Sequence, residues 1–447
     1  MLTGLRGRLE AADRRNLIRV MPAKGADVSA QSGTADVVVV GAGVIGLSIA
    51  WRAAQQGQRV VLADPQPGLG ATHAAAGMLT PIAEAAYAER EIFGLGQDSL
   101  RRYPDFVAEL QTVTGLPTGF RQAGTLQVAY DSDDLAALAE TRVLQETFGV
   151  HLQQLTAREC RAAEPMLDPA VRGGLLAPGD GSVDPRLLAV ALQQAAEGAG
   201  ARIIRQRVTE IRCAAGRADG VRLADDSIVQ APWIVLAAGW QSGGIAGLPA
   251  GGAPPVRPVK GQIIRLRTTA TTDAAGLPAG LLQRTVRGIV RGSSVYLVPR
   301  DSGELVVGAT QEELGPDMTV TAGGVWELLR DARTLVPGIT ELEVADIVAG
   351  LRPGTPDNAP VLGPSELPGL VLATGHFRAG VLMAPVTADT VAAFLRTGTP
   401  DPSWRPFAVG RFPARGGQAA SSGHPAADPA STRRAESDLP AAATAWR

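Results

Sequence analysis

A glycine-rich turn near the start of the chain, and one acid beyond it, have the spacing of a nucleotide-binding site. Gly41, Gly43 and Gly46 form the pattern GxGxxG, and Asp64 follows the next apolar run. The glycines let backbone N–H groups approach a pyrophosphate, and an acid at this separation binds the hydroxyls of an adenosine ribose. A glycine-rich turn that binds nothing is the alternative, but the flanking sequence favours a dinucleotide site.

Two strands and one helix must position these residues. Residues 36–40 are rich in valine and read as a buried parallel strand, residues 44–56 read as a helix that Gly57 ends, and residues 59–63 read as a second strand. This β-α-β unit places Val44 and Ile45, at the start of its helix, beside the nucleotide.

A run of small residues follows Asp64, from Gly68 to Leu79. Its backbone can come very close to a flat or charged group. Thr72 either caps the next turn or bonds a phosphate. For His73 we favour a contact with the edge of a cofactor over a catalytic role.

Two further apolar strands, residues 233–239 and 369–375, end in glycine far apart in the chain. An NAD site is completed within one compact unit, whereas the longer FAD must be held by distant segments, so this pattern favours FAD. The second strand leads into a turn and then an expected helix from Val381 to Leu395. The free N–H groups at the start of that helix would point at whatever lies beside the turn.

Composition excludes several classes of function. A formal net charge of −2 gives no drive toward nucleic acid or an anionic membrane. No stretch of about 18 apolar residues predicts a membrane span. Cys160 and Cys213 cannot build a disulfide framework, and the scattered histidines predict no metal site.

The order of these segments predicts an α/β plus α+β fold, in which a Rossmann-type FAD-binding domain is interleaved with a β-sheet-rich substrate domain. The FAD-binding domain should be discontinuous, with residues 35–115, 180–240 and 345–400. The substrate domain should comprise residues 116–179 and 241–344. Residues 1–34 and 401–447 have the composition of disordered extensions.

Several further blocks occur in one order along the chain: GATHAAAGML, PVKGQ, YLVPR, VVGAT, GLRPGTPDNAP and TGHFRAGVLMAP. With these blocks, over about residues 36–397, the chain resembles the D-amino acid oxidase superfamily of FAD-dependent amine oxidases, and within it the glycine oxidases of the thiamine pathway. One branch of that superfamily attaches its flavin through a cysteine late in the chain. The last cysteine here is Cys213, so the resemblance implies non-covalent FAD.

The resemblance also implies three substrate-binding residues. Arg352 would clamp the substrate carboxylate, Tyr296 would donate a second hydrogen bond to it, and the backbone carbonyl of Arg378 would face the amine. Fixing the substrate aims its Cα–H bond at the flavin, so no acid–base side chain is required. The alternatives are a structural ion pair for Arg352, a core position for Tyr296 and a bracing role for Arg378.

The cofactor contacts expected from the motifs and the resemblance form one set. They are Gly41, Gly43, Val44, Ile45, Gly46, Asp64, Thr72, His73, Ala75, Gly77, Met78, Val208, Ala238, Gly239, Gly375, His376, Phe377, Arg378, Ala379, Gly380, Val381 and Leu382.

The activity that the resemblance implies is oxidation of glycine to the imine, which yields glyoxylate and ammonia, while O2 becomes hydrogen peroxide. The imine would feed thiazole synthesis. A broader D-amino acid or sarcosine-type oxidase or dehydrogenase, and a non-catalytic flavoprotein subunit, are the alternatives. We expect a cytoplasmic homo-oligomer whose partners are a small amino acid and O2, with no nucleic acid or membrane.

Overall fold

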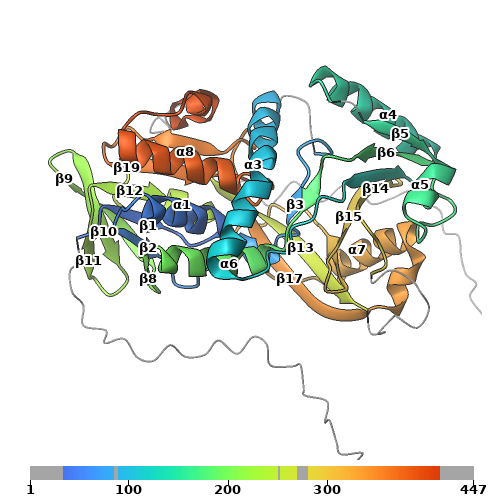
Figure 1. Ribbon diagram of the computed structural model, residues 1–447, viewed down its shortest axis with the longest axis horizontal. Helices are drawn as coiled ribbons and strands as arrows, with labels where there is room; N and C mark the ends of the chain where they lie inside the picture. Colours follow the sequence, from blue (N-terminus) through green and yellow to red (C-terminus); the bar gives the residue numbers. More distant parts are fainter. Residues whose placement is uncertain (1–33, 85–88, 151, 250–251, 269–279, 413–447) are drawn as a thin grey trace, which may run out of the picture.

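The computed structural model describes residues 34–84, 89–150, 152–249, 252–268 and 280–412. Two large sheets lie side by side, each with its own helices (Figure 1). The expected α/β plus α+β fold is confirmed. Most of the two expected disordered extensions, residues 1–33 and 413–447, lies outside the described residues. None of the described helices is long and apolar enough to cross a membrane.

The first sheet has six strands in the order β18-β19-β12-β1-β2-β8. All neighbouring pairs are parallel except β18 with β19. The bounds are β1 Val37–Val40, β2 Val60–Ala63, β8 Arg202–Ile204, β12 Trp233–Leu236, β18 Val361–Pro364 and β19 Leu370–Thr374. Every residue of β1 is buried, as expected for a central parallel strand covered on both faces.

Helices cover one face of this sheet and a small sheet covers the other. The helices are α1 Val44–Gln55, α3 Arg90–Thr114, α6 Pro185–Gly198 and α8 Ala384–Thr397. Val37 and Val39 of β1 point toward them, whereas Val38 and Val40 point toward the antiparallel strands β9 Val208–Ala214, β10 Arg217–Leu223 and β11 Ile228–Gln230.

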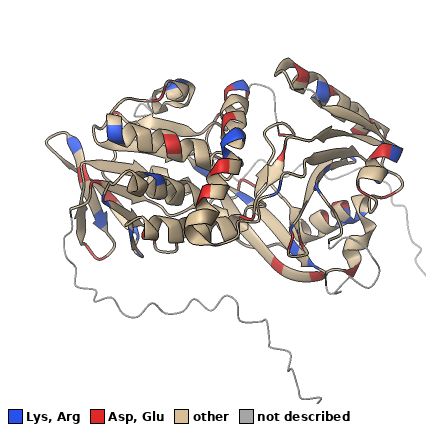
Figure 2. Ribbon diagram, viewed as in Figure 1, with Lys and Arg blue, Asp and Glu red and all other residues tan. Residues whose placement is uncertain are grey.

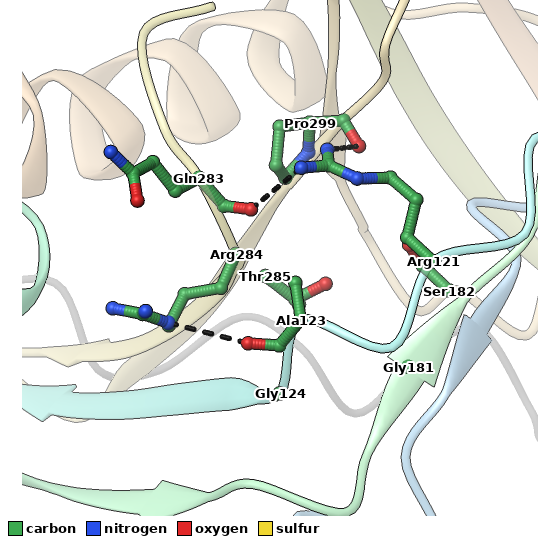
Figure 3. Close-up of a pocket in the computed structure, with 9 residues that line it drawn as sticks. All are labelled: Arg121, Ala123, Gly124, Gly181, Ser182, Gln283, Arg284, Thr285 and Pro299. Atoms are coloured by element: carbon green, nitrogen blue, oxygen red, sulfur yellow. Dashed lines mark hydrogen bonds between the residues drawn. The ribbon is translucent and has the colours of Figure 1, made fainter. Parts of the chain in front are cut away.

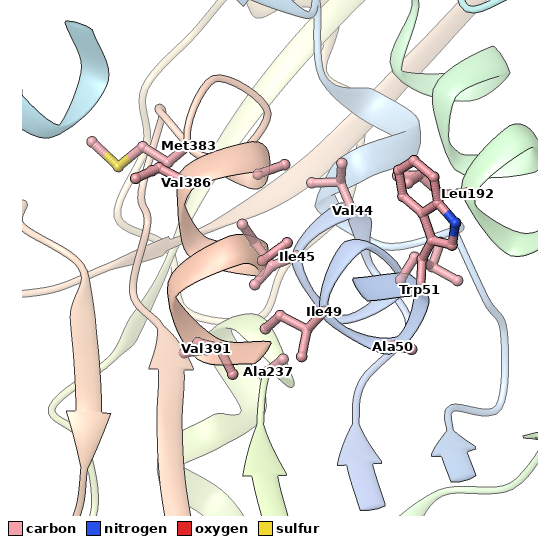
Figure 4. Packing of buried hydrophobic residues seen from close by; sticks show 14 of the residues in the cluster. Val44, Ile45, Ile49, Ala50, Trp51, Leu192, Ala237, Met383, Val386 and Val391 are labelled. Atoms are coloured by element: carbon pink, nitrogen blue, oxygen red, sulfur yellow. The ribbon is translucent and has the colours of Figure 1, made fainter. Parts of the chain in front are cut away.

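Helix α1, which carries the glycine turn at its start, is held on both sides. Ile45 and Ile49 pack toward α8, and Trp51 lies beside Leu192 of α6 (Figure 4). Arg52 also pairs with acids on two neighbouring helices, Glu109 of α3 at 2.6 Å and Asp389 of α8 at 3.0 Å. Figure 2 shows both acidic and basic residues along α3.

The second sheet has eight strands in the order β17-β13-β16-β15-β14-β4-β6-β5. Its bounds are β4 Thr125–Ala129, β5 Gln153–Thr156, β6 Gly173–Ala177, β13 Arg257–Arg267, β14 Thr285–Val290, β15 Ser293–Pro299, β16 Glu304–Gly308 and β17 Glu343–Gly354. Helix α7 (Ala322–Leu335) packs with the apolar residues of one face in a buried cluster. The opposite face, here called the site face, contacts the segment that follows β2 of the six-stranded sheet: a Cβ atom on Gly350 of β17 would lie 2.5 Å from the Cβ atom of Ala74.

The remaining elements connect the two halves. Ala74 ends α2 (Ala71–Ala74), and β3 (Met78–Leu79) pairs with β7 (Gly181–Ser182). The others are α4 Ser132–Thr147, α5 Ala157–Ala163, and the 3-10 turns η2 Gly239–Gly244, η4 Pro337–Glu341, η5 Pro402–Phe407 and η6 Val409–Arg411.

Strand β17 corrects one predicted domain boundary. We expected the FAD-binding domain to resume at residue 345, but β17 pairs with β13 along its whole length, from Glu343 opposite Arg267 to Gly354 opposite Arg257. Residues 345–354 therefore belong to the substrate sheet. An apolar run does not reveal which sheet it joins, because pairing with a distant strand decides that.

The last turns of the described chain correct a second expectation. Residues 401–412, predicted to be disordered, form η5 and η6, and Trp404 is buried. Its ring centroid lies 5.6 Å from that of Phe394 on α8, and its Nε1 donates to Thr390 Oγ1 at 3.2 Å. Thr34, also expected to be disordered, bridges to Gln230. Burial of Trp404 and Phe407, together with the ion pair of Arg411 and Asp357 at 2.7 Å, holds residues 401–412 against the FAD-binding domain.

Candidate active site

The glycine turn has the local geometry that its sequence predicts. Gly41 has φ +100°, and a Cβ atom there would lie 2.5 Å from the carbonyl oxygen of Ala237. A Cβ atom on Gly46 would lie 1.8 Å from the carbonyl oxygen of Gly41, so only glycine lets α1 approach β1 this closely. At Gly43 a Cβ atom would meet only the Thr72 hydroxyl, at 3.4 Å. The first and third glycines serve the fold, and the second leaves backbone open to a ligand.

Asp64 and Thr72 converge on this turn. Asp64 Oδ2 accepts from the backbone N–H of Ala42 at 2.8 Å, and its Oδ1 accepts from that of Gln66 at 2.7 Å. Thr72 Oγ1 accepts from the backbone N–H of Val44 at 3.0 Å. Thr72 therefore caps α1 across the chain rather than the turn that follows it. Each carboxylate oxygen of Asp64 keeps a second lone pair for another donor, such as a ribose hydroxyl.

The small-residue segment 73–78 is fixed by arginines that come from other elements. Arg186 Nε donates to the carbonyl of His73 at 3.1 Å, Arg265 Nη2 donates to that of Ala75 at 3.4 Å, and Arg300 donates to that of Ala76. A Cβ atom on Gly77, which has φ +71°, would lie 2.0 Å from the carbonyl of Val183. This backbone is thus held in place before any ligand binds.

The histidine and methionine of this segment differ in their surroundings. Burial lowers the pKa of His73, which keeps its ring neutral at physiological pH. Met78 Sδ lies 3.8 Å from Arg287 Nη1 on the site face.

The two glycine strand ends lie together although they are distant in the chain. Thr374, the last residue of β19, donates from Oγ1 to the carbonyl of Gly239 at 3.0 Å, just beyond β12. Gly239 has φ +57°, and no atom of the described residues lies within 4 Å of a Cβ position there. Ala238 and Gly239 therefore border open space at the carboxyl ends of the parallel strands, where ligands of such sheets bind.

The turn after β19 differs from our expectation. Helix α8 begins at Ala384 rather than Val381, with Pro385 in its first turn. Tyr103 Oη donates to the carbonyl of Val381 at 2.7 Å and Ser99 Oγ to that of Leu382 at 2.6 Å, which holds both residues outside the helix. The expected helix start at Val381 is therefore wrong by three residues.

Within that turn, backbone rather than side chains is available to a cofactor. The ring of His376 is buried against Thr387, with Nε2 3.1 Å from its Oγ1, and burial lowers the pKa of this histidine to about 3. Phe377 adopts a positive φ of 47°, which turns the chain sharply before Ala379 and Gly380. Val208 lies apart from this turn, buried at the start of β9 against the other face of the sheet.

These features fit FAD. The donor set at the glycine turn is neutral backbone N–H at a helix start, which suits a pyrophosphate. Open backbone positions at Gly43 and Gly239 form a cradle that a side chain would fill. The two positions come from two separate segments of the FAD-binding sequence, residues 35–115 and 180–240, as a long dinucleotide requires.

Tyr296 and Arg352 share the site face of the second sheet. Tyr296 on β15 pairs with Gly308 of β16, and a Cβ atom on Gly308 would lie 2.4 Å from Tyr296 Oη. Arg352 on β17 covers Gly261 of β13 in the same way, since a Cβ atom there would lie 2.4 Å from its Nη1 and Nη2. Each functional side chain therefore lies flat over a glycine on the neighbouring strand.

The guanidinium of Arg352 is partly occupied. Its Nη1 donates to the carbonyl of Thr310 at 3.1 Å and to that of Lys260 at 3.3 Å. In the described part of the chain no backbone carbonyl engages Nη2 or Nε, and the Tyr296 hydroxyl interacts with the same guanidinium. Its remaining donors are left for a carboxylate beside Tyr296. Burial raises the pKa of Tyr296 although Arg352 acts in the opposite direction, so the phenol keeps its proton and can donate.

The side chain of Arg378 has a different partner. Its Nη2 donates to Glu89 Oε2 at 2.8 Å, just before α3. Its backbone carbonyl accepts no hydrogen bond from the described residues. The structure thus brings Tyr296 and Arg352 together on one sheet, and places Arg378 on the turn of the other domain.

Sequence analysis did not identify several residues that build this site. They are the supporting glycines Gly261 and Gly308, the buried arginines Arg265 and Arg300, and the charged residues Glu84, Glu89 and Arg287. One signal in the sequence could have identified Arg287. Side chains alternate between the two faces of a strand, and Arg287 is a charged residue within the otherwise apolar strand β14.

A recess between Arg121 and Arg284 is separate from this site (Figure 3). Arg121 Nη2 donates to the carbonyl of Gln283 at 2.8 Å, and Arg284 Nε to that of Ala123 at 3.3 Å. Its lining includes none of the expected site residues. Both arginines fix loops, and we assign the recess a structural role.

Comparison with known proteins gives a consistent result. Residues 36–394 match the family model described as DAO, FAD dependent oxidoreductase. Glycine oxidase of Geobacillus kaustophilus is 34% identical over 361 residues, which cover 80% of this chain and 92% of that protein. A crystal structure of glycine oxidase from that organism superposes with a TM-score of 0.77 at 32% identity, covering 85% of this chain and 99% of that one.

Two other relatives differ in their descriptions. The bifunctional protein ThiO/ThiG of Trichormus variabilis is 32% identical over 389 residues, 85% of this chain and 55% of that protein. This chain therefore spans about half the length of such bifunctional relatives. The hydrogen cyanide synthase subunit HcnC of Pseudomonas aeruginosa is 29% identical over 417 residues, 85% of this chain and 96% of that protein.

Proposed function

The chain belongs to the DAO family of FAD-dependent oxidoreductases, and from this premise we propose that it is a glycine oxidase. It is an enzyme that uses FAD. The observation that carries the proposal is the position of Arg352 beside Tyr296 on the site face. The Arg352 guanidinium and the neutral Tyr296 hydroxyl can donate hydrogen bonds to the same anionic group. This combination favours a carboxylate, such as that of a small amino acid.

The proposed roles are those that the family resemblance implies, and the contacts of each residue support them. The remaining donors of the Arg352 guanidinium bind the substrate carboxylate, and Tyr296 donates a further hydrogen bond to it. The Arg378 carbonyl accepts a hydrogen bond from the substrate amine. With the carboxylate also bound, this contact fixes rotation about the bond between the carboxylate carbon and Cα. FAD held by the glycine turn would supply the two-electron acceptor for the hydride of Cα, with O2 as the final oxidant. No charged side chain is needed at Cα, because the amine lone pair forms the C=N bond.

The products are then the imine of glycine and hydrogen peroxide, and water converts the imine to glyoxylate and ammonia. The likeness to glycine oxidases of the thiamine pathway supports a role in supplying thiazole synthesis. The expected cytoplasmic location and homo-oligomeric state stay predictions.

Substrate size tests the proposal. One methyl group in an apolar site changes discrimination by only about 1–3 kcal/mol, so glycine should head a short list that includes sarcosine and D-alanine. L-amino acids should fail, because anchoring the carboxylate and amine leaves only one Cα hydrogen toward the flavin. Peroxide release by the purified protein, measured with glycine, sarcosine, D-alanine, D-proline and L-alanine, gives the ranking. A preference of more than tenfold for a bulky D-amino acid would replace glycine oxidase with a broader D-amino acid oxidase.

The mode of FAD attachment gives a second expected result. Purified protein should be yellow, and acid precipitation should release FAD into the supernatant, because neither cysteine lies in the described cofactor region: Cys160 is buried in the substrate domain and Cys213 lies on β9. The absorbance of supernatant and pellet checks this. Colour that stays in the pellet of the denatured protein would show a covalent bond.

A subunit of a larger flavoprotein complex is the second candidate, and the similarity to HcnC favours it. The two candidates differ in what the isolated chain does. A glycine oxidase turns over alone and releases peroxide in air, whereas a subunit that needs partners leaves O2 unconsumed.

A further inference from the structure

One ion pair on the site face has no part in the roles given above. Arg287 Nη1 on β14 lies 2.5 Å from Glu84 Oε1, and the two side chains are only 21% and 19% exposed. Glu84 follows β3 (Met78–Leu79) in the chain, five residues after that strand's end. It therefore comes soon after the small-residue segment that we propose to contact the cofactor. A half-buried pair of this kind loses most of the water that would otherwise screen it.

This pair lies beside the substrate-binding residues. Arg287 is the register partner of Tyr296 on the neighbouring strand, so both side chains project from the same face about 5 Å apart at their origins. Arg352 interacts with Tyr296 as well, and the charges of Glu84 and Arg287 both act on the Tyr296 hydroxyl. Tyr296 therefore lies between two arginines. Arg352 keeps donors for a ligand, whereas the charge of Arg287 is neutralised by Glu84.

The surroundings of Arg287 are polar and incompletely satisfied. Gln127 of β4 is its register partner on the other side, and Gln127 Nε2 is buried without a hydrogen-bond partner in the described structure. Thr125 Oγ1, on the same face of β4, lies instead beside the buried carboxyl group of Asp180. The Gln127 amide has no partner among the described residues, and a polar ligand group would satisfy it.

We propose that Glu84 is a specificity-determining residue, which holds Arg287 and so excludes amines that carry a second carboxylate. Arg352 binds the first carboxylate of any substrate. A second carboxylate that reached past Tyr296 would meet Arg287, but Glu84 already occupies its Nη1 and repels another anion. Without the charge of Glu84, the same arginine and the amide of Gln127 become a second carboxylate site. This inference rests on the proposed function, and it deepens it by naming the charge class of the substrate.

The Glu84→Gln variant tests the proposal, because glutamine keeps the size of the side chain and removes its charge. The probes are glycine and N-(carboxymethyl)glycine, which differ by one carboxymethyl group. The kcat/KM ratio of the dicarboxylic to the monocarboxylic amine should rise about ten- to a hundredfold in the variant, the range of one charge-assisted hydrogen bond. In the double variant Glu84→Gln/Arg287→Met the ratio should return toward that of the wild type.

Binding of unreactive acids separates this inference from the proposed function. Glutarate has the chain length of N-(carboxymethyl)glycine and no amine to oxidise, and butyrate lacks its second carboxylate. Titration of the flavin absorbance of each holoenzyme gives both dissociation constants. Glu84→Gln should favour glutarate over butyrate at least tenfold more than the wild type does, and the double variant should lose that preference.

Two outcomes would overturn the inference: an unchanged preference in Glu84→Gln with normal flavin content, or an equal gain in the double variant. The second would assign the effect to space rather than to Arg287. If the wild-type protein does not oxidise glycine, the proposed function is wrong. Binding of glutarate and butyrate would still test the role of Glu84.

Discussion

Replacement of Arg352 by alanine is expected to leave FAD bound and to lower kcat/KM for glycine by roughly 30- to several-thousand-fold. The carboxylate loses a charge-assisted pair in a partly desolvated site, which typically costs about 2–5 kcal/mol. FAD should remain, because the residues that we propose to contact it, such as Gly41, Thr72 and Gly239, lie beside the other sheet. Steady-state peroxide release and the flavin-to-protein absorbance ratio measure the two effects.

Controls separate binding from folding, since Arg352 also donates to the carbonyls of Thr310 and Lys260. Arg352→Lys keeps the charge but loses the two parallel donors, and its activity should lie between wild type and alanine. Tyr296→Phe removes one neutral donor worth about 0.5–1.5 kcal/mol, or roughly two- to tenfold. Near wild-type turnover by a folded, yellow Arg352→Ala protein would remove Arg352 from the site.

The nucleotide-binding unit could be predicted because its determinants are local. The strand–glycine–helix order, the end of α1 near Gly57 and the position of Asp64 all lie within one short stretch. Each element there is specified by its own residues: β-branched for the strand, glycine for the turn, apolar spacing for the helix. The structure changes these bounds by one residue at most.

The substrate sheet was harder to predict for a physical reason. Its order depends on pairing between strands far apart in the chain, such as β17 with β13 and β14 with β4. Strand composition is similar in both sheets, so it does not identify a partner. The start of α8 was missed for a related reason, because Ser99 and Tyr103 of α3 take the carbonyls that would otherwise begin the helix.

The role of Arg352 was assigned from the motif that contains it. The structure adds that its guanidinium lies over Gly261 of β13, which belongs to a different motif. The expected result is that Gly261→Ala lowers kcat/KM for glycine about a hundredfold while every charged residue of the site remains. A Cβ atom at residue 261 would lie 2.4 Å from both terminal nitrogens of Arg352 and 2.5 Å from its Cζ, so the guanidinium must move. Displacement of a substrate-binding group by about 1 Å can cost on the order of a hundredfold in rate.

A double-mutant cycle with Arg352→Ala decides whether the loss acts through the guanidinium. If it does, Gly261→Ala/Arg352→Ala should be no slower than Arg352→Ala alone, because the side chain that clashes is gone. Gly323→Ala on α7 is the matched control. The substitution is the same, but within the described part of the chain no atom lies within 4 Å of the new Cβ, so activity should be retained. Thermal unfolding and flavin content of all four proteins identify any general damage to strand β13. Two results would contradict this prediction: additive losses of kcat/KM in the double variant, or full activity in Gly261→Ala. Either would show that Gly261 does not determine the position of the Arg352 guanidinium.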